Sequence, residues 1–443
     1  MPSLTPLHET YCKWDRTPPS QADVLEGLAQ LITVRFSDAV HDLIQNIQRE
    51  VLISVFGMSE KNSKKFHQIP SVAKLYKVTY ESFFNYGTYL VAPSLRRLIE
   101  KFPKLHDKPL TPVLHFLVGA INGVIGDYLL KHQNPMALPM ALYDHYGEVQ
   151  KGDLSGPVTI FVHGLCMHHL TWSTAKYGGI SEKLLAHRGQ NTMLYLNYNT
   201  GRRISANGRS FANTLEDLLR RNPNISSINL IGHSMGGLVC RSALFYGKQN
   251  VYEWVAMVEN LVCLGSPHHG AALERMGFSF QEKIGHLPLG KIVGHLGNIR
   301  SNGILDLRYG SVRDDDWEHN EVRIGFMDDN RKAAPLPSHI KAYLVAGTIE
   351  FEHRQNRTRN VIGDYLVSVK SALGEHQNPR YQLKVPESHK AIFYGLNHME
   401  IQYHPLVAQQ IVHWFYPNSE EKAFTQIHEY MMDLDRLEGI ALT

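Results

Sequence analysis

The first third of the sequence has hydrophobic positions that follow a helical period. Between residues 23 and 56, apolar side chains recur at helical spacing and form one apolar stripe beside a polar face. These positions are Leu25, Leu28, Ile32, Val40, Leu43, Ile44, Ile47, Val51 and Val55. Further apolar blocks occupy residues 90–98 and 113–130. We therefore predict an N-terminal helical region over residues 1–140.

The apolar block at residues 113–130 contains three glycines, Gly119, Gly123 and Gly126. Their lack of side chains would let a neighbouring backbone approach closely, and we interpret them as helix packing rather than a membrane dimer motif. The longest apolar run, residues 113–125, is shorter than the about 20 residues that a membrane-spanning helix needs. The pattern therefore predicts a buried helix or a contact with a membrane surface.

The pattern changes near Tyr146, where short apolar runs begin to alternate with helical stretches. The predicted strands are residues 158–162, 193–198, 228–231, 261–264, 342–346 and 391–394. Helical patterns at residues 215–219 and 238–246 separate several of these runs. Parallel strands that are buried on both faces read as continuous apolar runs. The sequence therefore predicts an α/β fold with a mostly parallel central sheet and helices on both faces.

Two further segments complete the predicted organisation. Residues 271–338 carry aromatic and aliphatic side chains amid glycines and charges, and we interpret them as a cap inserted between two strands. The apolar side chains are Phe278, Phe280, Ile284, Leu287, Ile292 and Leu296. Residues 419–443 are typical of a C-terminal amphipathic helix and tail. Between the two terminal regions, residues 141–418 form the predicted α/β domain.

Composition and charge narrow the function classes. The chain has 45 Lys and Arg against 42 Asp and Glu, so its formal charge of +3 provides no dense basic field for nucleic acid. Its 4 cysteines include no C-x-x-C pair, which favours free thiols in a reducing compartment. Residues 1–23 lack the apolar segment of a secretory signal. We expect a cytoplasmic protein, with peripheral association at a membrane surface as the alternative.

The candidate nucleophile lies in the motif Gly232-His233-Ser234-Met235-Gly236, which matches G-x-S-x-G. A buried-strand pattern precedes the motif and a helical pattern follows it, which is the setting that this motif requires. The glycines suit a strained turn in which neighbouring side chains would clash. The N-terminus of the following helix favours the negative charge that develops during acyl transfer. The alternative is a glycine-rich turn with a solvated serine.

A serine hydroxyl needs a base to become a nucleophile near pH 7. In sheet hydrolases the histidine follows the last strand, and His398 fits this position better than His389 or His404. The acid should follow the predicted strand at residues 342–346. We favour Asp364, with Glu350 as the rival because it lies closer to the strand end. Either carboxylate would hold the histidine tautomer and stabilise the imidazolium.

The oxyanion hole needs two backbone N–H groups directed at the developing charge. One is expected from Met235, the residue after the nucleophile. The other should come from the loop after the first predicted strand, where Gly164 permits a bend and Leu165 is the expected donor. We interpret His163 as a residue that braces this loop.

These residues resemble the serine α/β-hydrolases, especially bacterial esterases and lipases. The likeness rests on His163-Gly164, the Ser234 turn, and Gly265-Ser266-Pro267-His268-His269-Gly270, which is similar to the lipase T-P-H-x-G segment. It also includes Gly363-Asp364, where Tyr365 replaces the usual glycine after the acid, and Asn397-His398-Met399-Glu400. Tyr198-Asn199-Thr200-Gly201-Arg202 and Asn207-Gly208-Arg209 resemble the bacterial branch related to glycosylphosphatidylinositol inositol-deacylases. The likeness covers residues 156–417.

The resemblance implies hydrolysis of acyl esters, including lipid esters, by a triad of Ser234, His398 and Asp364. An acyltransferase with the same triad and a non-catalytic binding module on the same fold are the alternatives. We predict no cofactor and no metal site. The pairs His168-His169 and His268-His269 lack an H-E-x-x-H motif, and adjacent residues usually point apart. We therefore interpret both pairs as loop histidines.

Overall fold

The computed structural model describes residues 18–31, 93–172, 180, 191–271, 301–317, 331–350 and 363–417. Three predicted features lie outside these residues, wholly or in large part. They are the helical pattern beyond Leu31, the apolar stretch at residues 278–296 and the C-terminal segment at residues 419–443.

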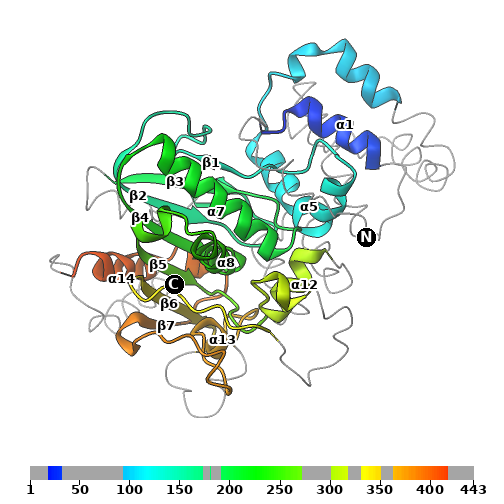
Figure 1. Ribbon diagram of the computed structural model, residues 1–443. Helices are drawn as coiled ribbons and strands as arrows, with labels where there is room; N and C mark the ends of the chain where they lie inside the picture. Colours follow the sequence, from blue (N-terminus) through cyan, green and yellow to red (C-terminus); the bar gives the residue numbers. More distant parts are fainter. Residues whose placement is uncertain are drawn as a thin grey trace, which may run out of the picture.

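Within the described residues, one sheet of 7 strands forms the centre of the protein, in the order β1-β3-β2-β4-β5-β6-β7 (Figure 1). The strands are β1 (Ala141–Tyr143), β2 (Ser155–Val162), β3 (Thr192–Asn197), β4 (Asn224–His233), β5 (Val258–Leu264), β6 (Lys341–Thr348) and β7 (Lys390–Tyr394). Strand β1 is antiparallel to β3, and all other neighbouring pairs are parallel. The prediction of a mostly parallel sheet is confirmed. The short strand β1 was not predicted, because three residues carry too little periodicity.

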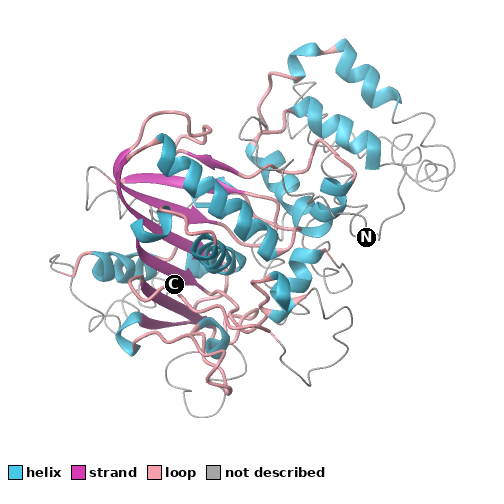
Figure 2. Cartoon of the chain, viewed as in Figure 1, coloured by secondary structure: helices cyan, strands magenta, loops and turns pink. Residues whose placement is uncertain are grey.

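Helices cover both faces of the sheet, as predicted (Figure 2). Adjacent residues of a strand point to opposite faces. Ile160 packs in the apolar cluster that contains the inner sides of α7 and α8, whereas its neighbour Phe161 packs in the cluster that contains α14. The helices of this part are α7 (Ile204–Arg221), α8 (Met235–Gln249), α9 (Trp254–Met257), α13 (Val369–Ala372) and α14 (Pro405–Phe415).

Helix α5 (Pro112–Lys131) packs beside the sheet, and α1 (Gln21–Leu31) and a helix at residues 93–101 lie farther from the sheet than α5 (Figure 1). A single apolar cluster includes residues of α1, α5 and the sheet. The Asn134 side-chain amide donates a hydrogen bond of 2.9 Å to the Gly27 carbonyl and so ties α1 to the chain after α5.

Helix α5 has 20 residues and is longer than the apolar run that the sequence analysis considered. By length and composition it is the one helix among the described residues that would suffice to cross a membrane, and 67% of its most apolar window is buried inside the protein. The prediction that this segment is too short to span was therefore wrong about length. The prediction of a buried helix is confirmed.

The glycines of α5 allow the close backbone contact that the sequence predicted. A Cβ atom at Gly119 would lie 2.9 Å from the Met167 carbonyl oxygen, and one at Gly123 would lie 3.0 Å from the Cys166 nitrogen. Such short separations require a glycine on the helix. Helix α5 therefore rests directly on the loop that follows β2.

The predicted insertion at residues 271–338 falls between β5 and β6 in the chain. Its described parts contain α12 (Asn302–Tyr309) and the short 3-10 helix η5 (Asp314–Asp316). At the start of α12, the Ser301 hydroxyl donates a hydrogen bond of 2.7 Å to the Gly123 carbonyl. The Asn302 N–H donates one of 3.0 Å to Asp127 Oδ2. This part of the insertion is therefore joined to α5.

Candidate active site

Ser234 lies at a sharp turn between β4 and α8, so the predicted strand, turn and helix are all present. Its backbone has φ 54° and ψ −121°, a conformation that costs a non-glycine residue about 1–3 kcal/mol. The Ser234 N–H donates a hydrogen bond of 2.8 Å to the carbonyl of Leu264 at the end of β5. The turn is thus held in place by the neighbouring strand.

The glycines of the motif are required by packing around this turn. A Cβ atom at Gly232 would overlap the backbone nitrogen of Gly237, and one at Gly236 would overlap the carbonyl oxygen of Val162. These obstacles are backbone atoms, so no side-chain rotation would relieve them. The motif therefore has the residue types that let α8 begin against the end of β2.

His398 and Asp364 are in direct contact, although 34 positions separate them in the sequence. His398 lies in the loop after β7, and its Nδ1 is 2.7 Å from Asp364 Oδ2. Both side chains are buried, with residue exposures of 3% and 0%. A carboxylate accepts a hydrogen bond, so this contact places the imidazole proton on Nδ1 and leaves Nε2 as a proton acceptor.

The loop of Asp364 is built around its carboxylate. Oδ1 accepts hydrogen bonds of 3.0 Å from the Leu366 N–H and 2.8 Å from the Val367 N–H. Tyr365 has φ 80°, the left-handed conformation that favours glycine, at the position where the resembled family usually has glycine. The carboxylate oxygens are therefore committed to the loop and to His398.

The other candidates from the sequence lie elsewhere. Glu350 follows β6, and its backbone carbonyl accepts a hydrogen bond of 3.2 Å from the Gly395 N–H. His389 donates from Nδ1 to the Ala342 carbonyl at 3.1 Å, at the beginning of β7. His404 precedes α14 and accepts a hydrogen bond from the Leu406 N–H at 3.3 Å. Among the described residues, Asp364 is the acid in contact with His398.

His233 connects the serine turn to the histidine loop. Its Nε2–H donates a hydrogen bond of 2.9 Å to the His398 carbonyl, and the two rings lie 4.9 Å apart. The sequence motif included His233 but gave no sign of this partner, because the two residues are 165 positions apart. The contact brings the loop of His398 beside Ser234. In this structure no hydrogen bond joins the Ser234 hydroxyl to His398, both of which are described residues; such bonds are often long before substrate binds.

The expected oxyanion loop lies beside the serine turn. Val162 and Gly232 are register partners in β2 and β4, so the loops that follow them leave the sheet together. A Cβ atom at Gly164 would lie 3.1 Å from the Cβ atom of Ser234. Leu165 is the next residue of the loop, and Met235 is the first residue of α8. The structure thus brings the segments of both expected N–H donors next to Ser234.

Residues that the sequence analysis did not assign hold this loop. The Tyr198 hydroxyl donates a hydrogen bond of 2.7 Å to the His163 carbonyl, and the Cys166 N–H donates one of 3.2 Å to Thr200 Oγ1. His163 also stacks on the Tyr198 ring at 4.5 Å. The family resemblance of residues 198–202 indicated that this block is important, but the residues that it contacts are set by the tertiary fold.

Burial controls the charge of two histidines next to the site. It lowers the pKa of His163 to about 4 and that of His233 to about 3, with the nearby His398 contributing at His233. Both rings are therefore neutral at pH 7. Gly265, with φ 56°, leaves space beside Asp364 and His398, since a Cβ atom there would lie 3.2 Å from Asp364 Oδ2. One group of described side chains has the spacing of metal ligands, and it comprises His115, His168 and His169.

The parallel sheet, the helices on both of its faces and the turn after β4 define an α/β-hydrolase fold. The sequence matches the PGAP1-like alpha/beta domain over residues 153–376, half of the chain. This chain therefore belongs to the PGAP1-like alpha/beta domain family. No curated protein matches the sequence.

Solved structures with a similar fold include bacterial esterases and lipases. The mature lipase BlEst2 of Bacillus licheniformis is 18% identical, with a TM-score of 0.36 over 60% of this chain and 94% of that chain. Carboxylesterase CesB of Bacillus subtilis is 13% identical, with a TM-score of 0.36 over 63% and 89%. A thermophilic esterase of Thermogutta terrifontis is 13% identical, with a TM-score of 0.35 over 63% and 93%. At these identities the likeness concerns the fold alone.

Proposed function

We propose that this protein is a serine hydrolase that cleaves carboxylic esters through an acyl-enzyme on Ser234. The hydrogen bond of 2.7 Å between His398 Nδ1 and Asp364 Oδ2 carries the proposal. It orients a buried imidazole so that Nε2 accepts a proton, and the His233 contact brings this loop next to the serine turn. A buried carboxylate, an oriented histidine and a serine in a strained turn together supply a nucleophile and its base.

In the proposed reaction, Ser234 Oγ attacks the ester carbonyl carbon while His398 Nε2 takes the hydroxyl proton. The imidazolium is stabilised by Asp364. The tetrahedral intermediate then collapses, the bond between carbon and the leaving oxygen breaks, and His398 donates its proton to the departing alcohol. Water, deprotonated by His398, attacks the acyl-enzyme and releases the acid and free Ser234.

The backbone N–H groups of Leu165 and Met235 are proposed to bind the oxyanion of both tetrahedral intermediates. Met235 is the first residue of α8, so the partial positive charge of the helix N-terminus adds to its N–H. The loss of one such donor typically lowers kcat by about 10²–10³-fold. The bracing of the Leu165 loop by Tyr198, Thr200 and α5 would hold its donor in position before substrate binds.

We further propose that the substrates are lipid esters or other acyl esters. Lipid esters would be hydrolysed at a membrane surface. The support is the apolar composition of residues 278–296, which lie outside the described residues. Hydrolysis of nitrophenyl esters of increasing acyl length, below and above micelle formation, tests this extension. A rise in kcat/KM with chain length is expected, and equal rates for all lengths would contradict a lipid-acyl pocket.

Labelling with a fluorophosphonate tests the nucleophile. The wild-type protein should react with one equivalent of probe and hydrolyse short nitrophenyl esters, and Ser234→Ala should lose labelling and about 10⁴-fold or more of kcat. Ser226→Ala, at an exposed position on the same strand, is the matched control and should retain both. Product analysis with an added alcohol distinguishes hydrolysis from acyl transfer.

The proposal would be overturned by a folded wild-type protein that neither labels nor cleaves these esters. It would equally be overturned by a Ser234→Ala variant that labels and hydrolyses like the wild type. Circular dichroism of each variant verifies that the protein is folded, because Ser234 lies in a strained turn.

A further inference from the structure

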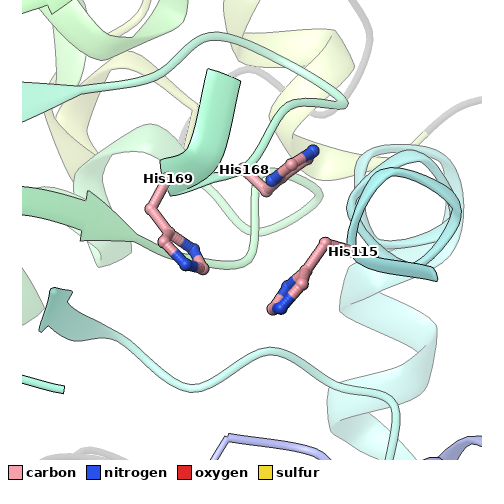
Figure 3. A group of neighbouring side chains, drawn as sticks. All are labelled: His115, His168 and His169. Atoms are coloured by element: carbon pink, nitrogen blue, oxygen red, sulfur yellow. The ribbon is translucent and has the colours of Figure 1, made fainter. Parts of the chain in front are cut away.

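Three histidines from two separate segments lie together where α5 packs against the chain after β2 (Figure 3). His115 projects from α5 toward His168 and His169, which lie at the start of the 3-10 helix η2 (His169–Trp172). One ring nitrogen from each residue lies within 4.8 Å of the corresponding nitrogens of the other two. The pair His168-His169 was predicted to be loop histidines, and nothing in the sequence near this pair indicates that α5 brings a third imidazole.

The two buried imidazoles of this cluster make few hydrogen bonds. The Nδ1 of His168 has no hydrogen-bond partner among the described residues, and the side-chain amide of Asn197 is the hydrogen-bonding group beside His169. His168 and His169 are only 5% and 2% exposed. Buried polar groups usually have a full set of partners, so three imidazoles whose nitrogens lie within 4.8 Å of one another point to a shared ligand.

The surroundings favour the neutral form of the three rings and orient one of them. Burial lowers the pKa of His115 to about 4 and that of His169 to about 3, and it lowers the pKa of His168 well below its usual value. The neutral imidazole is the form that binds metal ions. The Tyr143 ring stacks on His169 at 3.7 Å, with an angle of 12° between the planes, which fixes the direction of that ring.

We propose that His115, His168 and His169 form a binding site for a divalent late transition-metal ion, with zinc as the best fit. In a tetrahedral zinc site with Zn–N distances of about 2.1 Å, the nitrogens would lie roughly 3.4 Å apart. The separation of up to 4.8 Å leaves a difference that small rotations of the side chains would close. His115 is only partly buried, so solvent and an incoming ion have a route to the cluster.

The donor set selects the kind of ion. Three imidazoles without a carboxylate suit zinc, cobalt, nickel or copper and disfavour magnesium and calcium, which prefer oxygen ligands. A bound ion would join α5 to the segment that continues the Leu165 loop, in addition to the glycine contacts between them. The site would therefore fasten the N-terminal helices to the hydrolase part of the chain. It does not depend on whether Ser234 is reactive.

Metal binding by the full-length protein is the direct test. The protein is stripped with a chelator, titrated with Zn²⁺ by calorimetry, and examined with Co²⁺, whose visible absorption reports tetrahedral coordination. We expect one equivalent of ion per chain and a rise in Tm of about 3–5 °C at a 100-fold excess over Kd. Mg²⁺ should produce neither effect.

Two variants at the cluster and one control make the test specific. His115→Gln and His169→Gln should each weaken Zn²⁺ binding by at least about 100-fold and abolish the cobalt spectrum. His106→Gln, at an exposed position, should bind like the wild type. If His169→Gln fails to fold, the partly buried His115→Gln decides the question alone.

The proposal is wrong if the folded wild-type protein binds no Zn²⁺ or Co²⁺. It is also wrong if the variants bind as tightly as the wild type, since the ion would then lie elsewhere. Ester hydrolysis is not part of either outcome, so a failure here leaves the proposed function untouched.

Discussion

Two clusters of histidines lie near the end of β2, and they differ in their partners. In the first cluster His398 contacts Asp364 at 2.7 Å, and His233 donates to the His398 carbonyl at 2.9 Å. In the second cluster His169 has no carboxylate partner among the described residues, and the side-chain amide of Asn197 is the hydrogen-bonding group beside it. His398 and His169 are almost equally buried, with exposures of 3% and 2%. Burial alone therefore does not distinguish the two.

The comparison shows that the groups in contact with a buried imidazole determine which reaction or ligand its nitrogens can serve. A carboxylate at Nδ1 fixes the tautomer of His398 and leaves one nitrogen to move a proton, as general acid–base catalysis requires. Neutral imidazole nitrogens from separate chain segments suit a metal ion as their common partner. The same residue type, equally buried, thus supports two proposed functions in one protein.

The largest effect is expected from a substitution of Asp364, the carboxylate that contacts His398 in the first cluster. Asp364→Asn would present an amide to His398 Nδ1 and favour the wrong tautomer, so we expect kcat/KM for ester hydrolysis to fall by about 10⁴-fold. Steady-state kinetics with a short nitrophenyl ester measure this. Glu350→Gln is the control and should stay within about threefold of wild type. A large loss in Glu350→Gln with little change in Asp364→Asn would reverse the assignment of the acid.

A smaller effect is expected from a substitution where α5 packs against the loop that follows β2. Gly123→Val would introduce a Cβ atom 3.0 Å from the Cys166 backbone, and we expect the free energy of unfolding to fall by about 2–3 kcal/mol. Urea unfolding measures the loss. Gly152→Val is the control, because the nearest atom to a Cβ there is 3.8 Å away. Equal losses in both variants would mean that the close packing of α5 is unimportant.

The smallest effect concerns pH and His233. The pKa of His233 is about 3 when folded and about 6.5 when unfolded, so the unfolded chain binds its proton first as pH falls. Stability is therefore lost as pH drops from about 6.5 toward 3, by at most about 1.4 kcal/mol per pH unit from this residue. His233→Gln removes this contribution.

Urea unfolding of wild type and His233→Gln at about pH 7, 6 and 5 measures the difference in slope. The variant should lose less stability between pH 6 and pH 5 than the wild type does. His106→Gln is the exposed control. Parallel pH profiles for wild type and His233→Gln would contradict a neutral, buried His233.

Much of the fold could be predicted because its signals are local. Six continuous apolar runs predicted the six parallel strands, and the motif around Ser234 predicted a turn between a strand and a helix. Strand β1 escaped prediction because Ala141–Tyr143 is too short to show a period. The choice between Asp364 and Glu350 was open because distance from a strand end says little about where a loop directs its carboxylate.

The candidate sites depended on contacts between residues that are distant in the sequence. His233 meets His398 across 165 positions, and His115 reaches His168 from another helix. No periodicity or spacing encodes such pairs, since they arise when packed helices and strand ends bring separate loops together. The glycines of α5 gave a partial signal, because they predicted a close neighbour without identifying it.

The sequence by itself determined the class of fold, the elements that build it and the serine turn, because backbone sterics and the period of apolar burial act over a few residues. Only the tertiary structure decided which carboxylate meets His398, which residues brace the Leu165 loop and which histidines lie together. Those outcomes depend on how strand register and helix packing place whole segments, and on where burial removes water from their polar groups.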